Sequence, residues 1–295
     1  MITIIGMTWK EMLRKKVMLL TLLMTVVFLI AFWFVASTLG NRFLGISTRI
    51  DPESAEFLIE RYVTGGVILT LGFFFGSFVV AFLSIFSSFS VIAGEAEQGV
   101  LQALLPRPIP RWQWYAGRWI GFVSLGIGYA LLLFCSILAV TRMHATIPSD
   151  LGSLTLSFLL FASVVPILIS ISMLGSCYFS ALGNGVFMTM LFGVGWLGGM
   201  IEKLAGSFPL DQVVIKPLMT IAGVMSLLMP ADAIQRRMLA EMFNLSELQG
   251  IVNLNRSLGP FAFNQVPSNA FLLYAAAYTL LALLAGFWLF KRKDL

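Results

Sequence analysis

The chain has 295 residues, of which 59% are hydrophobic and only 11% charged, and its formal net charge is +5. A water-soluble domain carries roughly 25% charged residues, so this composition excludes a soluble enzyme or a soluble binding domain. The mean hydropathy is +0.92, and the apolar residues are grouped in long blocks. These features predict an all-α protein that crosses a membrane several times.

Six stretches of the sequence contain no Asp, Glu, Lys, Arg or His and approach the length of a membrane span. A helix needs roughly 17–25 residues to cross a hydrocarbon core of ~30 Å. Backbone groups in lipid must be satisfied within the segment, so we expect these stretches to be helices in one transmembrane domain covering residues 1–295. The predicted spans are 17–39, 65–92, 119–141, 154–179, 186–201 and 270–290.

The stretch 213–229 could be a seventh span, because Lys216 is its only charged residue. A seventh crossing would put the basic C-terminus on the side opposite to the basic N-terminus, against the positive-inside rule. We therefore favour a re-entrant or interfacial helix within an outer region 202–269, with the seventh span as the alternative.

The orientation follows from the basic residues close to the span ends. With six spans, one side of the membrane receives both termini and the connection between spans two and three. That side carries ten basic residues against four acidic ones, and the other side nine against ten. The sequence therefore predicts cytoplasmic N- and C-termini.

The first sixteen residues have the spacing of an amphipathic helix, predicted over residues 2–16. Its apolar face is expected to hold Ile2, Ile5, Trp9, Met12 and Leu13. We expect it to lie in the membrane interface against lipid, with Trp9, Lys10 and Arg14 as the interfacial residues. The alternative is a basic flank that only sets the topology.

The segment 94–114, between spans two and three, combines charge with three prolines. Residues 95–105 are predicted to form a short helix that stops at Pro106. Leu101, Leu104 and Leu105 would share an apolar face, which needs a partner surface. Basic and aromatic side chains follow and are predicted to anchor the chain at the membrane interface: Arg111, Trp112, Trp114, Tyr115 and Arg118.

This segment resembles the signature of ABC-2 type transporter permeases. The matching residues read Gly94-Glu95-x-Glu97-x-Gly99-Val-Leu-x-x-Leu104-Leu-x-Arg-Pro108-Ile-x-Arg111, where Val100 replaces a commoner threonine. Six spans, a basic amphipathic N-terminal helix and the C-terminal pattern Phe290-Lys-Arg-Lys-Asp294-Leu295 agree with the family. The pattern Pro230-Ala-Asp232 resembles the permeases of the nitrous-oxide reductase maturation system.

The resemblance implies that the segment is a coupling helix, which sits in a cleft of a separate ATP-binding subunit. The residues implied in this contact are Glu95, Glu97, Gly99, Leu101, Leu104, Leu105, Pro108 and Arg111. It also implies two copies of the ATP-binding subunit, a second permease copy or homologue, export, and the cell membrane of a bacterium or archaeon. The chain has no Gly-x-x-x-x-Gly-Lys-Ser/Thr loop, so ATP and Mg²⁺ are expected on the partner, and the chain itself is expected to bind no cofactor or nucleic acid.

Other functions remain as alternatives. The same coupling device could transmit a signal to an extracytoplasmic partner without transport. An ion-coupled transporter usually carries ionisable residues within its spans, and the six predicted spans carry none. An intramembrane hydrolase could use Ser176, but the only histidine, His144, lies in a predicted outer loop. With a single histidine and two cysteines inside predicted spans, neither a metal site nor a disulfide framework is expected.

Small residues inside the spans are the remaining clues to cargo. Ser84, Ser88, Ser163 and Ser170 could line a pathway, although membrane helices commonly use serine for close packing. Close helix contacts, including a possible seam between two permease copies, are expected at the glycines of spans two and five: Gly72, Gly76, Gly193, Gly195, Gly198 and Gly199. A pathway without charges favours an amphipathic, lipid-like or peptide substrate.

Overall fold

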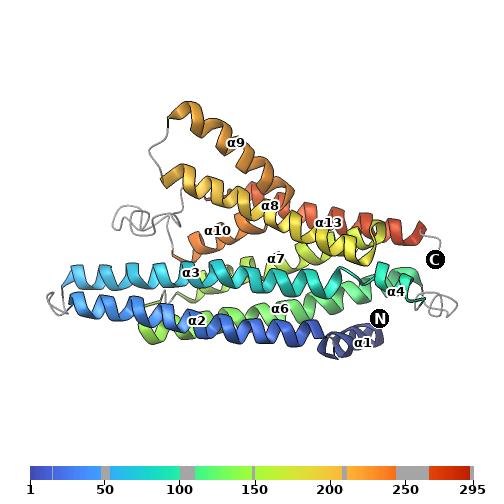
Figure 1. Ribbon diagram of the computed structural model, residues 1–295, viewed down its shortest axis with the longest axis horizontal. Helices are drawn as coiled ribbons and strands as arrows, with labels where there is room; N and C mark the ends of the chain where they lie inside the picture. Colours follow the sequence, from blue (N-terminus) through green and yellow to red (C-terminus); the bar gives the residue numbers. More distant parts are fainter. Residues whose placement is uncertain are drawn as a thin grey trace.

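The computed structural model describes residues 1–14, 16–47, 54–99, 110–147, 150–207, 211–243 and 266–292. All regular secondary structure in these ranges is helical (Figure 1). The helices are α1 (Ile2–Arg14), α2 (Lys16–Ser47), α3 (Ala55–Ser88), α4 (Ala93–Glu97), α6 (Arg111–His144), α7 (Leu151–Tyr178), α8 (Ala181–Ser207), α9 (Gln212–Leu228), α10 (Ala231–Met242) and α13 (Asn269–Arg292). Among the described residues, six helices (α2, α3, α6, α7, α8 and α13) are long and apolar enough to cross a membrane, which confirms the predicted all-α polytopic fold.

Four of these helices, α2, α3, α6 and α7, lie side by side along the long axis of the molecule (Figure 1). Helix α13 packs on α7, while α8 packs on α7 and α3 and carries α9. Helix α1, helix α4 and the C-terminal end of α13 lie at the same end of the bundle, here named the terminal end (Figure 1). The opposite end, where α2 ends and α3 begins, is named the distal end.

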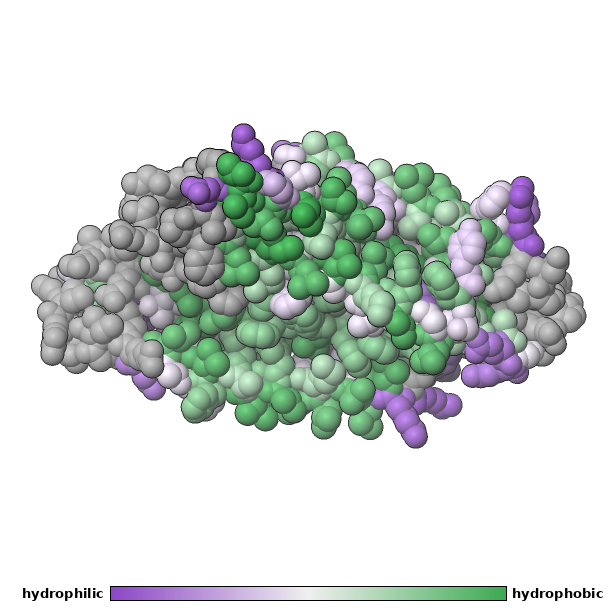
Figure 2. All heavy atoms as spheres, turned by 45° about the horizontal axis from the view of Figure 1, so that its top comes forward, coloured by the Kyte–Doolittle hydropathy of each residue, from purple (hydrophilic) through white to green (hydrophobic). Residues whose placement is uncertain are grey.

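The bundle keeps its polar and apolar surfaces apart. Figure 2 shows hydrophobic side chains across the middle of the face that it presents, with most hydrophilic side chains toward the two ends. Inside the bundle, Phe73 meets Phe134 and Phe161 with ring centroids 5.1 and 5.5 Å apart. At Gly72 an added Cβ would lie 2.7 Å from Phe32 and 2.8 Å from Ile137, so this glycine lets α3 approach α2 and α6. The outer apolar band is the surface that a bilayer would cover.

Helices α9 and α10 form a bent pair, with an angle of 99° between them. Helix α9 runs antiparallel to α8: Met225 lies against Gly198, and Met229 reaches Gly195, midway along α8. Helix α10 then returns toward the distal end, where the Phe243 carbonyl accepts a hydrogen bond of 3.4 Å from Tyr62 near the start of α3. The pair therefore begins and ends toward the distal end, which favours a re-entrant hairpin. The choice between this hairpin and a seventh span stays a prediction.

The expectation that residues after 201 form an outer region is wrong for the first of them. Helix α8 continues to Ser207, so Glu202 and Lys203 belong to a helix that could cross the membrane. Helix α10 is buried among α3, α7 and α8 rather than lying outside the bundle. The expectation that the spans carry no ionisable residue consequently fails at the distal end of α8. A hydropathy pattern ends a span at its first charges, whereas here oppositely charged neighbours on α10 offset them.

Candidate functional site

The segment after α3 begins with a short helix, α4. Helix α4 ends at Glu97, and Gly99 has a φ of +71°, a left-handed conformation that glycine adopts without strain. The helix predicted over 95–105 is therefore interrupted at Gly99, and its remainder, 100–105, lies outside the described residues. The expected apolar contacts at Leu101, Leu104, Leu105 and Pro108 lie outside the described residues.

Helix α4 is fixed to the junction between α7 and α8. The Ser176 hydroxyl on α7 accepts hydrogen bonds from the backbone N–H groups of Ile92 and Ala93, at 3.1 and 2.9 Å. The Glu97 carboxylate accepts a bond of 3.1 Å from the N–H of Ala181, the first residue of α8. A carboxylate at this position satisfies an orphan donor and opposes the positive end of the helix dipole.

The turn before α4 is held by a side chain from the same junction. The Asn184 amide donates to the carbonyl oxygens of Phe89 and Ser172, at 2.7 and 2.8 Å. An added Cβ at Gly175 would lie 2.2 Å from the side-chain Oδ1 of Asn184, so only glycine leaves room for this side-chain amide. Residues 89–97 therefore have a defined position on the ends of α7 and α8.

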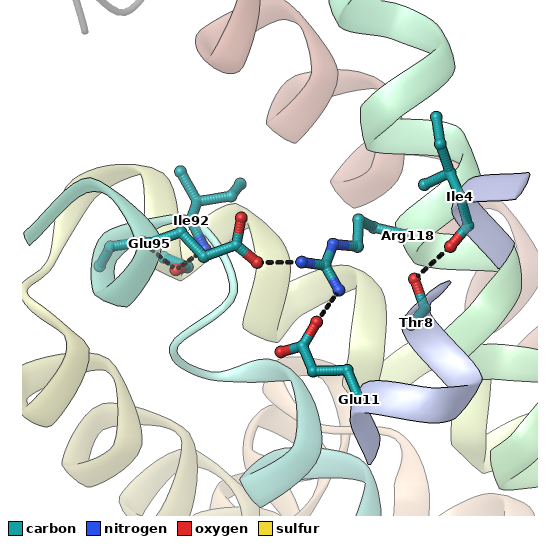
Figure 3. Close-up of polar contacts among 8 residues, drawn as sticks. Ile4, Thr8, Glu11, Ile92, Glu95 and Arg118 are labelled. Carbon is teal, nitrogen blue, oxygen red and sulfur yellow. Dashed lines mark hydrogen bonds and ion pairs between the residues drawn. The ribbon is translucent and has the colours of Figure 1, made fainter. Parts of the chain in front are cut away.

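A single arginine joins α4 to the N-terminal helix (Figure 3). Arg118 on α6 is 3% exposed, and its guanidinium pairs with Glu11 of α1 and with Glu95 of α4. The planar guanidinium presents several N–H donors at fixed angles, so it can bind two carboxylates at once. The N–H donors that Glu95 and Glu97 meet in the structure thus belong to this chain.

Helix α1 packs against the first turns of α6. Ile4 and Thr8 lie over Gly117 and Gly121, where an added Cβ would come within 2.9 and 2.8 Å of them. The indole N–H of Trp9 donates to the Ser124 hydroxyl at 2.9 Å. Two glycines one turn apart therefore form the seat of α1.

The face of α1 that packs on the protein differs from the predicted apolar face. Its buried residues are Ile4, Thr8 and Met12, whereas Ile2 and Leu13 are exposed. Trp9 is also largely exposed, as are Lys10 and Arg14 on the polar side. Of the predicted face, Ile2, Trp9 and Leu13 thus remain available to lipid, although the Trp9 indole also bonds to α6.

The terminal end of α13 meets the first turn of α6. The Arg111 guanidinium donates to the Lys291 carbonyl at 2.9 Å, which satisfies one of the orphan carbonyls at a helix end. Trp114 stacks on Phe290 with ring centroids 5.0 Å apart. Trp114, Tyr115 and Arg118 are buried, so their predicted role as anchors at the membrane interface is wrong. They face α13 and α1 instead of the membrane surface.

A scan against protein families matches residues 3–295 to the ABC-2 family transporter protein. The chain belongs to this family. It is accordingly a multi-pass permease subunit of an ABC transporter, a class that works with an ATP-binding subunit. A search of curated proteins found no match to the chain. The likeness to the nitrous-oxide reductase maturation permeases stays a prediction, because the family match does not distinguish subgroups.

In this ABC-2 permease the four serines predicted as possible pathway residues bond within the bundle. Ser84 and Ser163 donate to carbonyl oxygens of their own helices, at 2.8 and 2.7 Å. Ser88 bonds to the Ser172 hydroxyl at 2.9 Å, and Ser170 accepts from the Trp119 indole at 2.9 Å. These contacts favour helix packing over a pathway lining. Among the predicted glycines of α8, Gly195 and Gly198 pack against α9 within the chain. An added Cβ at Gly193 would meet no described atom within 4 Å, so the close contact expected there is not formed inside the chain, and a seam between two copies stays a prediction.

The arrangement of the permease does not support hydrolysis at Ser176. The Ser176 hydroxyl is engaged by two backbone N–H groups, while His144 ends α6 at the distal end of the bundle. Among the described residues no group of three His, Cys, Asp or Glu side chains could hold a metal ion. Sequence reasoning missed Ser176, Asn184 and Arg118 as the residues that position α4. Only Gly175 next to Ser176 gave a local signal of close packing.

Proposed function

We propose that this permease lines the translocation pathway of an ABC transporter and couples it to ATP hydrolysis through α4 and residues 100–109. The observation that carries the proposal is the ion-paired Arg118, which joins α1, α4 and α6. A displacement of α4 would be passed directly to two other helices, because a buried guanidinium resists separation from its carboxylate partners.

The partner would hold ATP and Mg²⁺ and receive the chain from the cytoplasm. Leu101, Leu104 and Leu105 would enter its cleft, with Pro108 bounding the contact. Because ABC ATPases act in pairs, two ATP-binding subunits would serve two permease copies around one pathway. The cargo is an exported amphipathic, lipid-like or peptide molecule, and the host membrane is the cell membrane of a bacterium or archaeon.

The contacts of α4 would transmit its displacement to two separate groups of helices. Through Arg118, a push on α4 would move α1 and the first turns of α6. Through Ser176 and the Ala181 N–H, it would move the junction of α7 and α8. The helices would then tilt as rigid bodies, as in other domain rearrangements.

Glu11 offers the sharpest test, because its loss leaves Arg118 paired with Glu95. Reversing the charge of Glu95 itself would leave a buried arginine without its deeper partner and would disturb folding. In the purified complex, E11A should reduce the stimulation of ATP hydrolysis by the permease about fivefold or more, the scale of typical coupling energies. The measurement is the ATPase rate of the ATP-binding subunit with and without each permease variant.

The matched control is K10A, which removes a neighbouring exposed charge from the same helix. Both variants must co-purify with the ATP-binding subunit, so that altered coupling is separated from lost assembly. Wild-type stimulation by E11A, or an equal loss with K10A, would contradict the proposed role of Arg118.

A further inference from the structure

Four charged side chains are buried together where α8 crosses α10, in the distal half of the bundle. Glu202, Lys203, Asp232 and Arg236 are each less than a tenth exposed. Arg236 pairs with Glu202, and its Nε lies 3.1 Å from Asp232, whose other oxygen lies 3.4 Å from the Lys203 ammonium. We name these four residues the charge quartet.

The backbone of α8 leaves space for the charge quartet at a glycine. An added Cβ at Gly199 would lie 1.8 Å from the Asp232 carboxylate, so only glycine at this position allows α10 to approach α8 so closely. In the described part of the chain, Arg118 is the one other charged residue that is buried. Burying ions costs several kcal/mol each, and ionisable residues at membrane depth typically mark functional sites.

The three ion pairs of the quartet do not have the same surroundings. Glu202 and Arg236 line an open groove of about 380 Å³ between α9, α10 and the start of α13. Asp232 instead lines a cavity of about 20 Å³ on another face of α10, with room for about one water molecule. Only the Glu202–Arg236 pair therefore faces a space that could hold a ligand.

The groove combines this ion pair with apolar walls. Leu227 and Phe271 line it, and Leu227 is also exposed on the apolar surface of α9. Ser226, which lines the groove, is 6% exposed, and its hydroxyl has no hydrogen-bond partner among the described residues. A ligand could thus enter from the lipid with its chains on apolar side chains and its head group beside Glu202, Arg236 and Ser226.

We propose that this groove binds a zwitterionic phospholipid of the surrounding bilayer. The head group would form an ion pair with each of these two residues: its phosphate would bind Arg236 and its ammonium would bind Glu202. Every charge then keeps an opposite neighbour in a low-dielectric site. An anionic head group would draw Arg236 away and leave Glu202 without a cation. A cationic one would draw Glu202 away and leave Arg236 with only Asp232, which Lys203 already shares. Either imbalance is costly at this depth.

The test compares lipids that share acyl chains and differ only in the head group. Purified permease is titrated with phosphatidylethanolamine, phosphatidylglycerol and diacylglycerol, and retained lipid is counted by native mass spectrometry. We expect phosphatidylethanolamine to be retained about tenfold or more over either other lipid. The free energy that corresponds to a tenfold preference is a modest fraction of the cost of an unpaired buried charge. A phosphatidylethanolamine with a photoactivatable head group should label the end of α8 around Glu202, or peptides within 212–243 or 266–292.

Two double variants separate the groove from the rest of the quartet. E202Q/R236M removes the pair that lines the groove and leaves Lys203 with Asp232, so it should lose the selectivity for phosphatidylethanolamine. K203M/D232N removes the other pair, leaves Arg236 with Glu202, and should keep the selectivity. Both remove one positive and one negative charge, and melting temperatures report whether each is folded.

Equal retention of the three lipids by the wild-type protein would overturn the proposal. Selectivity that survives in folded E202Q/R236M, or labelling confined to other helices, would overturn it as well. The measurement needs no ATP and no partner subunit, so its failure is distinguishable from failure of the coupling proposed for Arg118.

Discussion

Arg118 shows how much of the site depends on one side chain with distant partners. It is separated by 107 positions from Glu11 and by 23 from Glu95, yet it binds both carboxylates. The guanidinium carbon of Arg118 also lies 5.5 Å from the centroid of the Trp114 ring, which adds a cation–π contact. A lysine would carry the charge without the planar fork that reaches two carboxylates, so the two residues are not interchangeable here.

The seat of α1 makes a prediction about single glycines. G121A places a methyl group 2.8 Å from the Thr8 side chain, so α1 must shift. We expect a loss of about 1–3 kcal/mol of stability, the usual cost of overpacking, seen as a lower melting temperature in detergent.

The control for this prediction is G128A on the same helix, where an added Cβ meets nothing within 4 Å. Alanine is a better helix former than glycine by about 1 kcal/mol, so this variant should be neutral or more stable. If G121A melted at or above the temperature of G128A, close packing of α1 on Gly121 would be refuted.

At the residue scale, the sequence predicted the region of the site better than its contacts. The charges and glycines of residues 94–99 indicated that the site lies in the connection between spans two and three. The partners could not be predicted, because Ser176 and Asn184 are ordinary polar residues within or beside apolar stretches and acquire their roles only when α7 and α8 pack on α4. Arg118 was misread for the same reason.

At the scale of elements, the bent pair of α9 and α10, the predicted re-entrant hairpin, must satisfy backbone groups where it breaks inside the bundle. The last carbonyls of α9 would otherwise be exposed to lipid. The Tyr274 hydroxyl donates to Leu227 at 2.6 Å, and the Tyr278 hydroxyl donates to Leu228 at 3.0 Å. Helix α13 thus holds the tip of the hairpin in place.

Removing both hydroxyls should loosen this tip. In Y274F/Y278F, we expect faster hydrogen–deuterium exchange in peptides covering the end of α9, with α8 unchanged. Each bond is worth about 0.5–1.5 kcal/mol, which corresponds to roughly a twofold to tenfold faster exchange per bond. The matched control is Y129F, which removes a bond to Thr25 between α2 and α6. Unchanged exchange at α9 in the double variant would show that the tyrosines do not hold the hairpin.

The spans were predictable because an 18-residue apolar window decides membrane insertion largely from its own composition. Each predicted stretch coincides with one of the six long helices, apart from residues 89–92 after α3 and residue 179 after α7. The points at which the helices break were harder to predict from the sequence. Helix α10 carries Asp232 and Arg236, which mark it as an exposed segment until their partners on α8 are known. At α4 an amphipathic pattern extended the predicted helix past Gly99, although glycine commonly ends helices.

At the scale of the whole molecule, the two buried charge clusters lie at different depths of one bundle. The Arg118 cluster joins helices at the terminal end, and the charge quartet joins α8 to α10 in the distal half. Between them the packing is mostly apolar, through contacts such as those of Phe73 and Val165. A movement at α4 can reach the distal half through α7 and α8, which contact both regions.

The topology that this arrangement requires can be measured by cysteine labelling. In a background with C135S and C177S, single cysteines are introduced at the exposed positions Gln98, Thr146, Asp211 and Ser268. An impermeant maleimide should label Q98C only after the membrane is opened, because ten of the basic residues predict that the terminal end is cytoplasmic. T146C, at the distal end, should be labelled in intact cells.

The pair D211C and S268C decides between the two arrangements of residues 212–243. Asp211 precedes α9, and Ser268 precedes α13, so a re-entrant hairpin leaves both on the same side as Thr146. A seventh crossing would put Ser268 on the opposite side from Asp211 and would move the basic end of α13 away from α1. That outcome would also break the contact between Arg111 and the Lys291 carbonyl. Labelling of both cysteines in intact cells is therefore the expected result, and protection of S268C alone would reject the hairpin.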